Sequence, residues 1–160
     1  MYIGFLLKYR ITNILAIDCE MVEVDNLYNG LARITIVNYN GDILLDSFCK
    51  PEGEITNYRY EITGITEKTL ENAVSYEKCR QLALNIIKNK IIVGHSIDND
   101  LLVLNHQHPY NLIRDTAKFK KFQQNTNRMA SLKALTEQYF GIKIQNSTHD
   151  SVLFNLLILD

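Results

Sequence analysis

Apolar and polar residues alternate in three runs near the start of the chain, and these runs predict three consecutive β-strands. Residues 14–22 begin with four apolar or small side chains, 31–39 alternate between apolar and polar, and 43–49 are mostly apolar. Asn40-Gly41 stands directly between the last two runs, and this dipeptide strongly favours a tight hairpin turn. The pattern therefore predicts an antiparallel meander.

Two mixed segments beside these strands are expected to be loops. Residues 23–30 are polar and turn-like, and residues 50–64 mix polar with aromatic side chains. Beyond them, Thr66 is in position to cap a short helix and Ser75 a longer one. The apolar residues expected to share one face of the longer helix are Leu82, Ile86 and Ile87.

The second half of the chain combines short apolar runs with amphipathic segments. Strands are expected over 90–94 and 111–115, and a helix is expected to begin near Ser96. Ser131 begins a further helix, which a glycine ends, and a short last helix begins near Asp150. This order predicts an α/β fold: a mixed sheet of three antiparallel strands followed by parallel strands, flanked by helices.

Composition describes an ordinary globular domain. The 160 residues are 46% hydrophobic and 22% charged, with only 2 Pro and 7 Gly, so we expect a single domain over residues 1–160. The formal net charge is -1, and no global positive field attracts nucleic acid. Any RNA or DNA must therefore be bound by a local patch of positive charge.

The N-terminal segment and the cysteines indicate an intracellular protein with no membrane partner. The apolar run at 2–7 is too short to span a membrane, and its charges follow it, which is wrong for a signal peptide. The three cysteines, Cys19, Cys49 and Cys79, include no C-x-x-C pair. This spacing argues against a disulfide framework and against a zinc site.

Three acidic residues are candidates for metal binding. Asp18 and Glu20 project from the same face of the first strand, about 6.6 Å apart at a rise of ~3.3 Å per residue. Two such carboxylates repel each other, and a bound Mg²⁺ or Mn²⁺ would relieve the repulsion. The alternative is a strand that runs into a polar turn with both acids solvated. Asp100, beside the carboxyl end of a later strand, is the candidate partner, whereas Asp98 is better placed as a helix-start charge.

Three segments, in order along the chain, resemble the motifs of the DEDDh 3′→5′ exonucleases, and most closely the Rex-type RNA exonuclease branch. They are DCEMV at 18–22, GHSIDNDLL at 94–102 and HDSV at 149–152. The stretch 31–66 and the SLKAL segment before the last motif are also similar to that branch. The resemblance extends over about residues 12–157 and implies a ribonuclease H-like fold.

The resemblance also implies a role for each motif residue. Asp18, Glu20 and Asp100 would hold two Mg²⁺ or Mn²⁺ ions, and His149 would take the proton from the attacking water. Met21 is similar to the residue that packs against the terminal base, although simple core packing is an alternative. The implied partners are the 3′ end of an RNA and, as a further candidate, a ribosome or pre-ribosome. The implied location is the nucleus or nucleolus, with the cytoplasm as the alternative.

Cations outside the motifs are candidates for phosphate contacts. Two of them are Arg33 and Arg59. The alternative interpretation of each is a solvated charge on the surface. The segment 116–136 contains five cations and no acid, and Phe119 and Phe122 lie among them. Such a segment can bind phosphates and stack bases, and its alternative is a solvated loop. The five cations are Lys118, Lys120, Lys121, Arg128 and Lys133.

The last motif departs from the family at one position. The family has a fourth carboxylate five residues after the histidine, where this chain has Phe154. A phenyl ring cannot coordinate an ion, and Asp150, Asn155 and Asp160 are not at equivalent positions. We therefore expect one well-held metal ion or none, and a large loss of rate.

Three functions remain open at this point. The first is a weakened 3′→5′ RNA exonuclease. The second is a catalytically inactive exonuclease-fold protein that binds RNA or a ribonucleoprotein such as the ribosome. The third is a deoxyribonuclease, because ribose contacts depend on backbone geometry that the sequence does not reveal. The sequence does not predict an oligomeric state.

Overall fold

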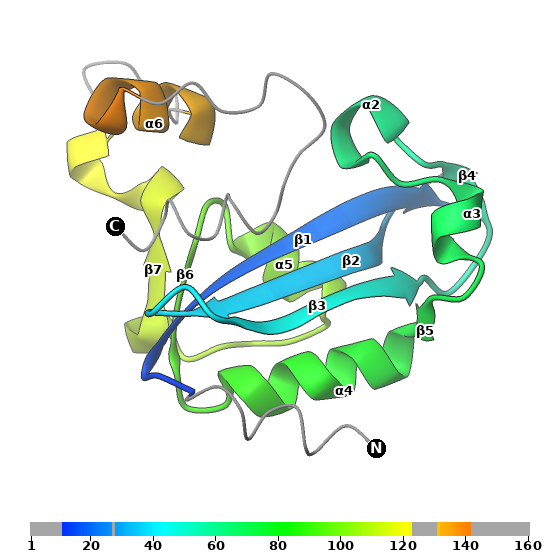
Figure 1. The fold of residues 1–160 in the computed structure, drawn as a ribbon, viewed down its shortest axis with the longest axis horizontal. Helices are drawn as coiled ribbons and strands as arrows, with labels where there is room; N and C mark the ends of the chain where they lie inside the picture. The colour runs from blue at the N-terminus through cyan, green and yellow to red at the C-terminus, as the bar shows by residue number, and fades with distance from the viewer. Residues whose placement is uncertain (1–10, 27, 123–130, 142–160) are drawn as a thin grey trace.

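A seven-stranded mixed sheet lies at the centre of the computed structural model (Figure 1), which describes residues 11–26, 28–122 and 131–141. The strands are β1 (Ile14–Val24), β2 (Tyr28–Asn38), β3 (Ile43–Lys50), β4 (Ile55–Asn57), β5 (Val74–Ser75), β6 (Ile91–Gly94) and β7 (Ile113–Asp115). The helices are α2 (Tyr60–Thr63), α3 (Glu67–Leu70), α4 (Tyr76–Ile87), α5 (Asp98–Val103) and α6 (Leu132–Phe140). Short 3₁₀ turns cover Tyr110–Leu112, Thr116–Lys118 and Lys120–Phe122.

The strand order confirms the predicted architecture. β1, β2 and β3 form an antiparallel meander, and the Asn40-Gly41 turn joins its second and third strands. β6 then pairs parallel to β1, and β7 pairs parallel to β6. The full order is β5-β3-β2-β1-β6-β7, with the short β4 paired to β1 beside this path. The three antiparallel strands are thus followed by parallel strands, with helices packed around them.

The two faces of β1 serve different purposes. Leu15, Ile17 and Cys19 belong to a buried apolar cluster that also contains residues of α4 and α5. Side chains alternate along a strand, so Asp18 and Glu20 project from the opposite face. The apolar half of the strand therefore anchors it in the core while the acidic positions remain available for chemistry.

Two expected loops are wrong. β1 continues to Val24 and β2 begins at Tyr28, so the connection within 23–30 is a tight turn, where Asp25 and Asn26 have positive φ values of 51° and 56°. Residues 50–64 contain β4 and α2. The first error arises because β1 and β2 continue to pair with each other up to Val24 and Tyr28. β4 was missed because it pairs with the end of β1, and a local reading of the sequence cannot detect a partner about 30 residues away.

The helix predictions are mostly confirmed, with shifts at the ends. Thr66 caps α3 through reciprocal hydrogen bonds with Thr69, and Ser131 caps α6, which Gly141 ends in a left-handed conformation. Ser75 precedes α4 without a side-chain capping bond. The buried face of α4 runs through Cys79, Ala83, Ile86 and Ile87, so Leu82 is only partly buried.

The later strands and α5 are shorter than the sequence pattern predicts. β7 begins at Ile113 because Tyr110–Leu112 forms a 3₁₀ turn, and α5 begins at Asp98, two residues after the expected start. The helix predicted near Asp150 lies outside the described residues. Within the described ranges, no helix is long and apolar enough to cross a membrane.

Gly94 is packed too tightly for any larger residue, so we predict that Gly94→Ala destabilises the fold. An added Cβ would lie 2.8 Å from Ile97 Cγ1 and 3.0 Å from the carbonyl oxygen of Ile17. Overpacking of this kind costs about 1–3 kcal/mol in the free energy of unfolding, measured by urea denaturation.

Gly141→Ala is the matched control for this substitution. Gly141 has a φ of 69°, but a Cβ there would have no neighbour within 4 Å among the residues that the structure describes. Its replacement should therefore cost only the left-handed penalty, about 1 kcal/mol. Equal losses for the two variants would contradict the tight packing around Gly94.

Candidate active site

A β-bulge at the end of the acidic pair shapes the site. The pairing of β1 with β2 shifts register between Glu20 and Met21, so that Glu20 lies opposite Arg33 but Met21 lies opposite Leu31. In a regular strand, Glu20 and Met21 would project from opposite faces. A bulge bends the strand and changes where its side chains point. Both residues therefore line the same cavity.

The cavity has a volume of about 400 Å³ and is built from four parts of the chain. β1 forms one wall, the region of α2 forms another, and the loop after β6 and the start of α6 complete it. The lining residues are Asp18, Cys19, Glu20 and Met21, then Arg59, Ile62 and Thr63, then His95 and Ser96, and finally Ser131 and Leu132.

Asp100 reaches this site through one hydrogen bond. The backbone N–H of Cys19 donates to Asp100 Oδ1 at 2.8 Å, across 81 residues of sequence. This bond joins α5 to β1 between Asp18 and Glu20, so the structure brings the three predicted acids to the same region. Asp100 and Glu20 are each only 5% exposed.

The electrostatics of the site favour a bound cation. Burial raises the pKa of Asp100 well above its ordinary value, and the negative charge of Asp18 raises it further. Burial also raises the pKa of the Cys19 thiol, followed by the charges of Asp100 and Asp18. Ionisation of Asp100 is therefore disfavoured in the metal-free chain, and a cation bound beside Asp18 and Asp100 would favour it.

The donor set fits a hard divalent ion, although the described side chains do not form a closed ligand set. Asp18, Glu20 and Asp100 offer only carboxylate oxygens, the ligands that Mg²⁺ and Mn²⁺ prefer. Asp18 Oδ2 is buried without a hydrogen bond among the described residues, although the carboxylate as a whole has an interaction elsewhere. Across 11–26, 28–122 and 131–141, no group of three or more His, Cys, Asp or Glu side chains is arranged as a metal site.

The two candidate arginines have different positions. Arg59 lines the cavity, donates to Asn29 Oδ1 at 2.7 Å and lies 3.7 Å from a carboxylate oxygen of Glu23. Arg33 does not line the cavity, and its guanidinium forms two hydrogen bonds to Asp46, at 2.8 and 2.9 Å. Arg59 therefore lines the cavity together with Asp18 and Glu20, whereas Arg33 lies across from Glu20 on β2 without lining it.

The position of Met21 is compatible with packing against a base and with packing in the core. Its side chain lines the cavity and also packs against the main apolar cluster. His149 and Phe154, the two residues that decide the last motif, lie outside the described residues.

The basic segment begins beside the site. Lys118 pairs with Asp98, with 2.6 Å between Nζ and Oδ2, while Lys120 and Lys121 are exposed. Phe122 packs between Phe119 and Tyr139, with ring centroids 5.0 Å apart in both contacts. This aromatic row fixes the segment to α6 and leaves Phe119 and Tyr139 about half exposed. Arg128 is outside the described ranges.

Sequence reasoning missed His95, Ser96 and Asp115. His95 and Ser96 line the cavity, and the Asp115 carboxylate accepts hydrogen bonds from the loop that carries them. A positional rule could have found all three, because they follow or end β6 and β7, and parallel sheets build their sites at the carboxyl ends of strands.

Comparisons with known proteins agree with this geometry. The RNase T family model, described as exonuclease, matches residues 15–153. RNA exonuclease 4 of Cryptococcus neoformans is 43% identical over 142 residues, covering 87% of this chain and 35% of that protein. RNA exonuclease 4 of Candida albicans is 39% identical over 140 residues, covering 86% of this chain and 49% of that protein. The chain thus spans between about a third and a half of these relatives.

Solved structures show the same fold. The catalytic unit of Pan2 from Neurospora crassa, with protease and nuclease domains, has a TM-score of 0.81 and 27% identity, covering 93% of this chain and 26% of that chain. The Pan2 pseudoubiquitin hydrolase and RNA exonuclease module of Saccharomyces cerevisiae, in complex with A7 RNA, also has a TM-score of 0.81. Its identity is 25%, over 92% of this chain and 27% of that chain.

We predict that Asp100→Asn stabilises the metal-free protein at neutral pH. Asparagine keeps the Oδ1 acceptor for the Cys19 N–H but removes a buried charge that Asp18 repels. The expected gain is roughly 1 kcal/mol, typical of a single stabilising substitution, measured by urea denaturation in the presence of a chelator.

Asp98→Asn is the matched control, because Asp98 lies on the same helix but is exposed and paired with Lys118. It should give no gain. Mn²⁺ should then stabilise the wild type and leave the Asp100→Asn variant unchanged. A loss of stability in Asp100→Asn would mean that the Asp100 charge is already compensated within the chain.

Proposed function

The chain belongs to the RNase T exonuclease family, and from this premise we propose that it removes nucleotides from the 3′ end of RNA by metal-assisted hydrolysis. The observation that carries the proposal is the bond between Asp100 and the backbone of Cys19, which brings a third carboxylate to the acidic pair of β1 beside a nucleotide-sized cavity. RNA is favoured over DNA because the similar proteins are named RNA exonucleases.

The acids would act by holding the metal. The exonuclease family generally uses divalent metal ions, and Asp18, Glu20 and Asp100 are the residues that would hold Mg²⁺ or Mn²⁺ here. When bound, the metal would supply an activated water and would stabilise the charge that develops on the phosphate. By resemblance, His149 would accept the proton of that water, because a neutral imidazole is a competent base at cellular pH.

The remaining cavity residues would hold the end of the RNA. Met21 offers a flexible, polarisable side chain against which a base can pack. Arg59 offers a cation within the cavity lining, where it could contact a phosphate, whereas Arg33 lies outside that lining and is paired with Asp46. Lys118, Lys120 and Lys121 lie on the segment that follows β7, where they would contact phosphates further along the strand.

A second function is favoured by one feature of the sequence. Phe154 occupies the position at which the resembled motif has its fourth carboxylate. With three acids, the site would hold one ion well at most, so the chain would be a slow exonuclease or an inactive one that binds RNA in the same cavity. The resemblance further suggests a ribosome or pre-ribosome as a partner, and a nuclear or nucleolar location with the cytoplasm as the alternative.

The test of catalysis is the trimming of a 5′-labelled single-stranded RNA in Mg²⁺ or Mn²⁺, with a DNA of the same sequence in parallel. We predict a ladder of products shortened from the 3′ end of the RNA. Asp18→Ala should reduce the rate at least about 100-fold, because metal stabilisation of the transition state contributes several kcal/mol. Glu71→Ala, which removes an exposed carboxylate outside the cavity, should leave the rate unchanged.

Phe154→Asp separates the two functions. If the wild type is inactive and this variant trims RNA, the chain is an exonuclease that has lost a metal ligand, and its own function is binding. If the wild type trims RNA and Asp18→Ala does not, the remaining three acids and His149 are sufficient for catalysis. Degradation that persists in Asp18→Ala would exclude the proposed site.

We also predict that the basic segment contributes a salt-dependent share of RNA affinity. Replacing Lys118, Lys120, Lys121, Arg128 and Lys133 by Gln should reduce the slope of log affinity against log salt by about 3 to 4, at ~0.7 per phosphate contact on a single strand. The control replaces Lys50, Lys68, Lys78, Lys88 and Lys90, which changes the net charge equally. Equal slopes for the two variants would mean that the segment does not contact RNA.

A further inference from the structure

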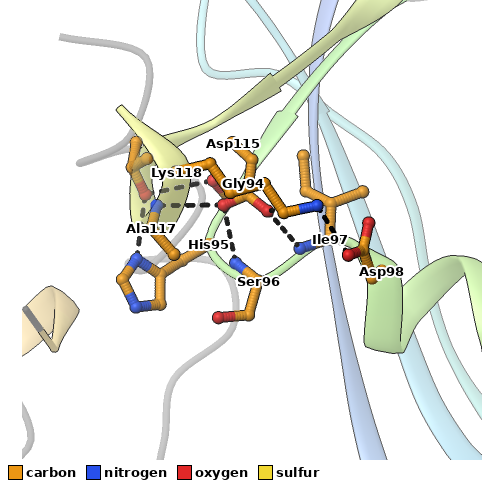
Figure 2. A network of polar contacts seen from close by, with 9 residues as sticks. Gly94, His95, Ser96, Ile97, Asp98, Asp115, Ala117 and Lys118 are labelled. Carbon is orange, nitrogen blue, oxygen red and sulfur yellow. Dashed lines mark hydrogen bonds and ion pairs between the residues drawn. The ribbon is translucent and has the colours of Figure 1, made fainter. Parts of the chain in front are cut away.

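The carboxylate of Asp115 holds together two segments beside the candidate site (Figure 2). Asp115 ends β7, and its side chain is only 3% exposed. Its Oδ1 accepts from the backbone N–H groups of Ser96 at 2.8 Å and Ala117 at 2.9 Å, and its Oδ2 accepts from Ile97 at 3.2 Å. Lys118 Nζ lies 4.0 Å from Oδ2. Asp115 therefore connects the loop between β6 and α5 to the start of the basic segment.

This loop has a conformation that its own residues do not favour. Ser96 has a φ of 62°, in the left-handed region where a side chain crowds the backbone. The backbone N–H groups of Ser96 and Ile97 each donate a hydrogen bond to the buried Asp115 carboxylate, and these bonds hold the two residues in place. Strained backbone at functional sites is commonly maintained by surrounding contacts of this kind. The strained conformation of Ser96 is thus stabilised by a residue outside the loop.

The loop in turn places Asp100. α5 begins at Asp98, directly after the two residues that Asp115 holds, and Asp100 follows in the first turn of that helix. A change at Ser96 or Ile97 would shift the start of α5. It would also alter the 2.8 Å bond between Asp100 Oδ1 and Cys19 N, which has the narrow tolerance of a hydrogen bond.

The same segment also orients His95. The Thr116 hydroxyl donates to the carbonyl oxygen of Gly94 at 3.1 Å, so at the 2.9 Å contact with His95 it must accept the Nδ1 proton. This arrangement leaves Nε2 of His95 as a hydrogen-bond acceptor on a side chain that lines the cavity. Asp115 supports it by holding Ala117, the next residue after Thr116.

We propose that Asp115 is a positioning residue for the proposed exonuclease reaction: by fixing the loop at 94–97, it sets the position of Asp100 beside Asp18 and presents His95 to the substrate. The effect on catalysis rests on the proposed function, because it can be measured only if the chain trims RNA. The structural readout, the bond between Asp100 and Cys19, is independent of catalysis.

The test compares Asp115→Asn with Asp25→Asn in the full chain. Asparagine at 115 keeps the shape and the Oδ1 acceptor, but it directs an amide NH₂ instead of Oδ2 at the Ile97 N–H. Asp25 is a matched control because its carboxylate also holds a loop, accepting from Glu54 N at 2.9 Å and from the Tyr28 hydroxyl at 2.8 Å, and it does not line the cavity.

The first readout is hydrogen exchange of the Cys19 amide, measured by NMR without metal. We expect exchange at least tenfold faster in Asp115→Asn than in the wild type, and no change in Asp25→Asn. The second readout is RNA trimming, with kcat about tenfold lower, a raised Mn²⁺ concentration for half-maximal rate, and KM for RNA within twofold. Asp25→Asn should change none of the three.

Ser96→Gly provides a rescue test, because glycine adopts the observed φ without strain. Added to Asp115→Asn, it should restore part of the Cys19 protection and of kcat. If Asp115→Asn does not fold, Asp115→Glu, which keeps the charge one methylene farther out, replaces it with the same expected outcomes.

Unchanged Cys19 exchange and Mn²⁺ dependence in Asp115→Asn, with only a lower free energy of unfolding, would overturn the proposal. An inactive wild type would overturn only the proposed exonuclease activity. The exchange rate of the Cys19 amide would still show whether Asp115 positions Asp100.

Discussion

The hydrogen bond from the Cys19 backbone to Asp100 is the interaction on which the candidate site depends. It is made across 81 residues, and it fixes a buried carboxylate against the backbone of β1 between the residues that carry the other two acids. The arrangement is unfavourable in isolation, because burial and the charge of Asp18 both oppose ionisation of Asp100. A fold that keeps such a group in place has a destabilised region with a chemical use, as active sites commonly do.

The sheet supplies the rigidity that this unfavourable arrangement requires. Leu15 and Ile17 are fully buried in the main apolar cluster, and β1 is paired on one side with β2 and on the other with β6. The bulge after Glu20 then turns Met21 toward the acids without breaking the strand. The acids thus project from the most constrained strand of the sheet, while the parts of the cavity around α2 and α6 come from peripheral elements (Figure 1).

What the sequence predicts here follows from short-range physics. The period of two along β1 was sufficient to place Asp18 and Glu20 on one face, and Asn40-Gly41 was sufficient to place the hairpin. The errors involve partners distant in sequence. β4 was missed because it is defined by pairing with β1. The ion pair between Arg33 and Asp46, across the meander, likewise has no local signal.

The candidate site follows the same division. The motif residues could be predicted from their residue types and their spacing along the chain. The conformation of the loop at 94–97 could not, because it is set by Asp115 from the next strand. A left-handed serine has no signature in a sequence. A carboxylate that will accept three backbone N–H groups looks the same as a solvated one until the chain is folded. The residues that would contact the metal or the RNA are therefore easier to predict than the residues that hold them in position.

The acid count bears directly on how many ions the site can hold. Four ionised carboxylates would balance the charge of two divalent ions, whereas Asp18, Glu20 and Asp100 would fall one charge short even when all three are ionised. A second ion would leave one excess positive charge in a buried region, which a further negative group such as the phosphate of a bound RNA end would have to neutralise. The phenyl ring of Phe154 offers no carboxylate to supply that charge. With a single ion, the acids would still hold an RNA end through its phosphate, and the proton transfer expected of His149 would decide whether that RNA is also cut.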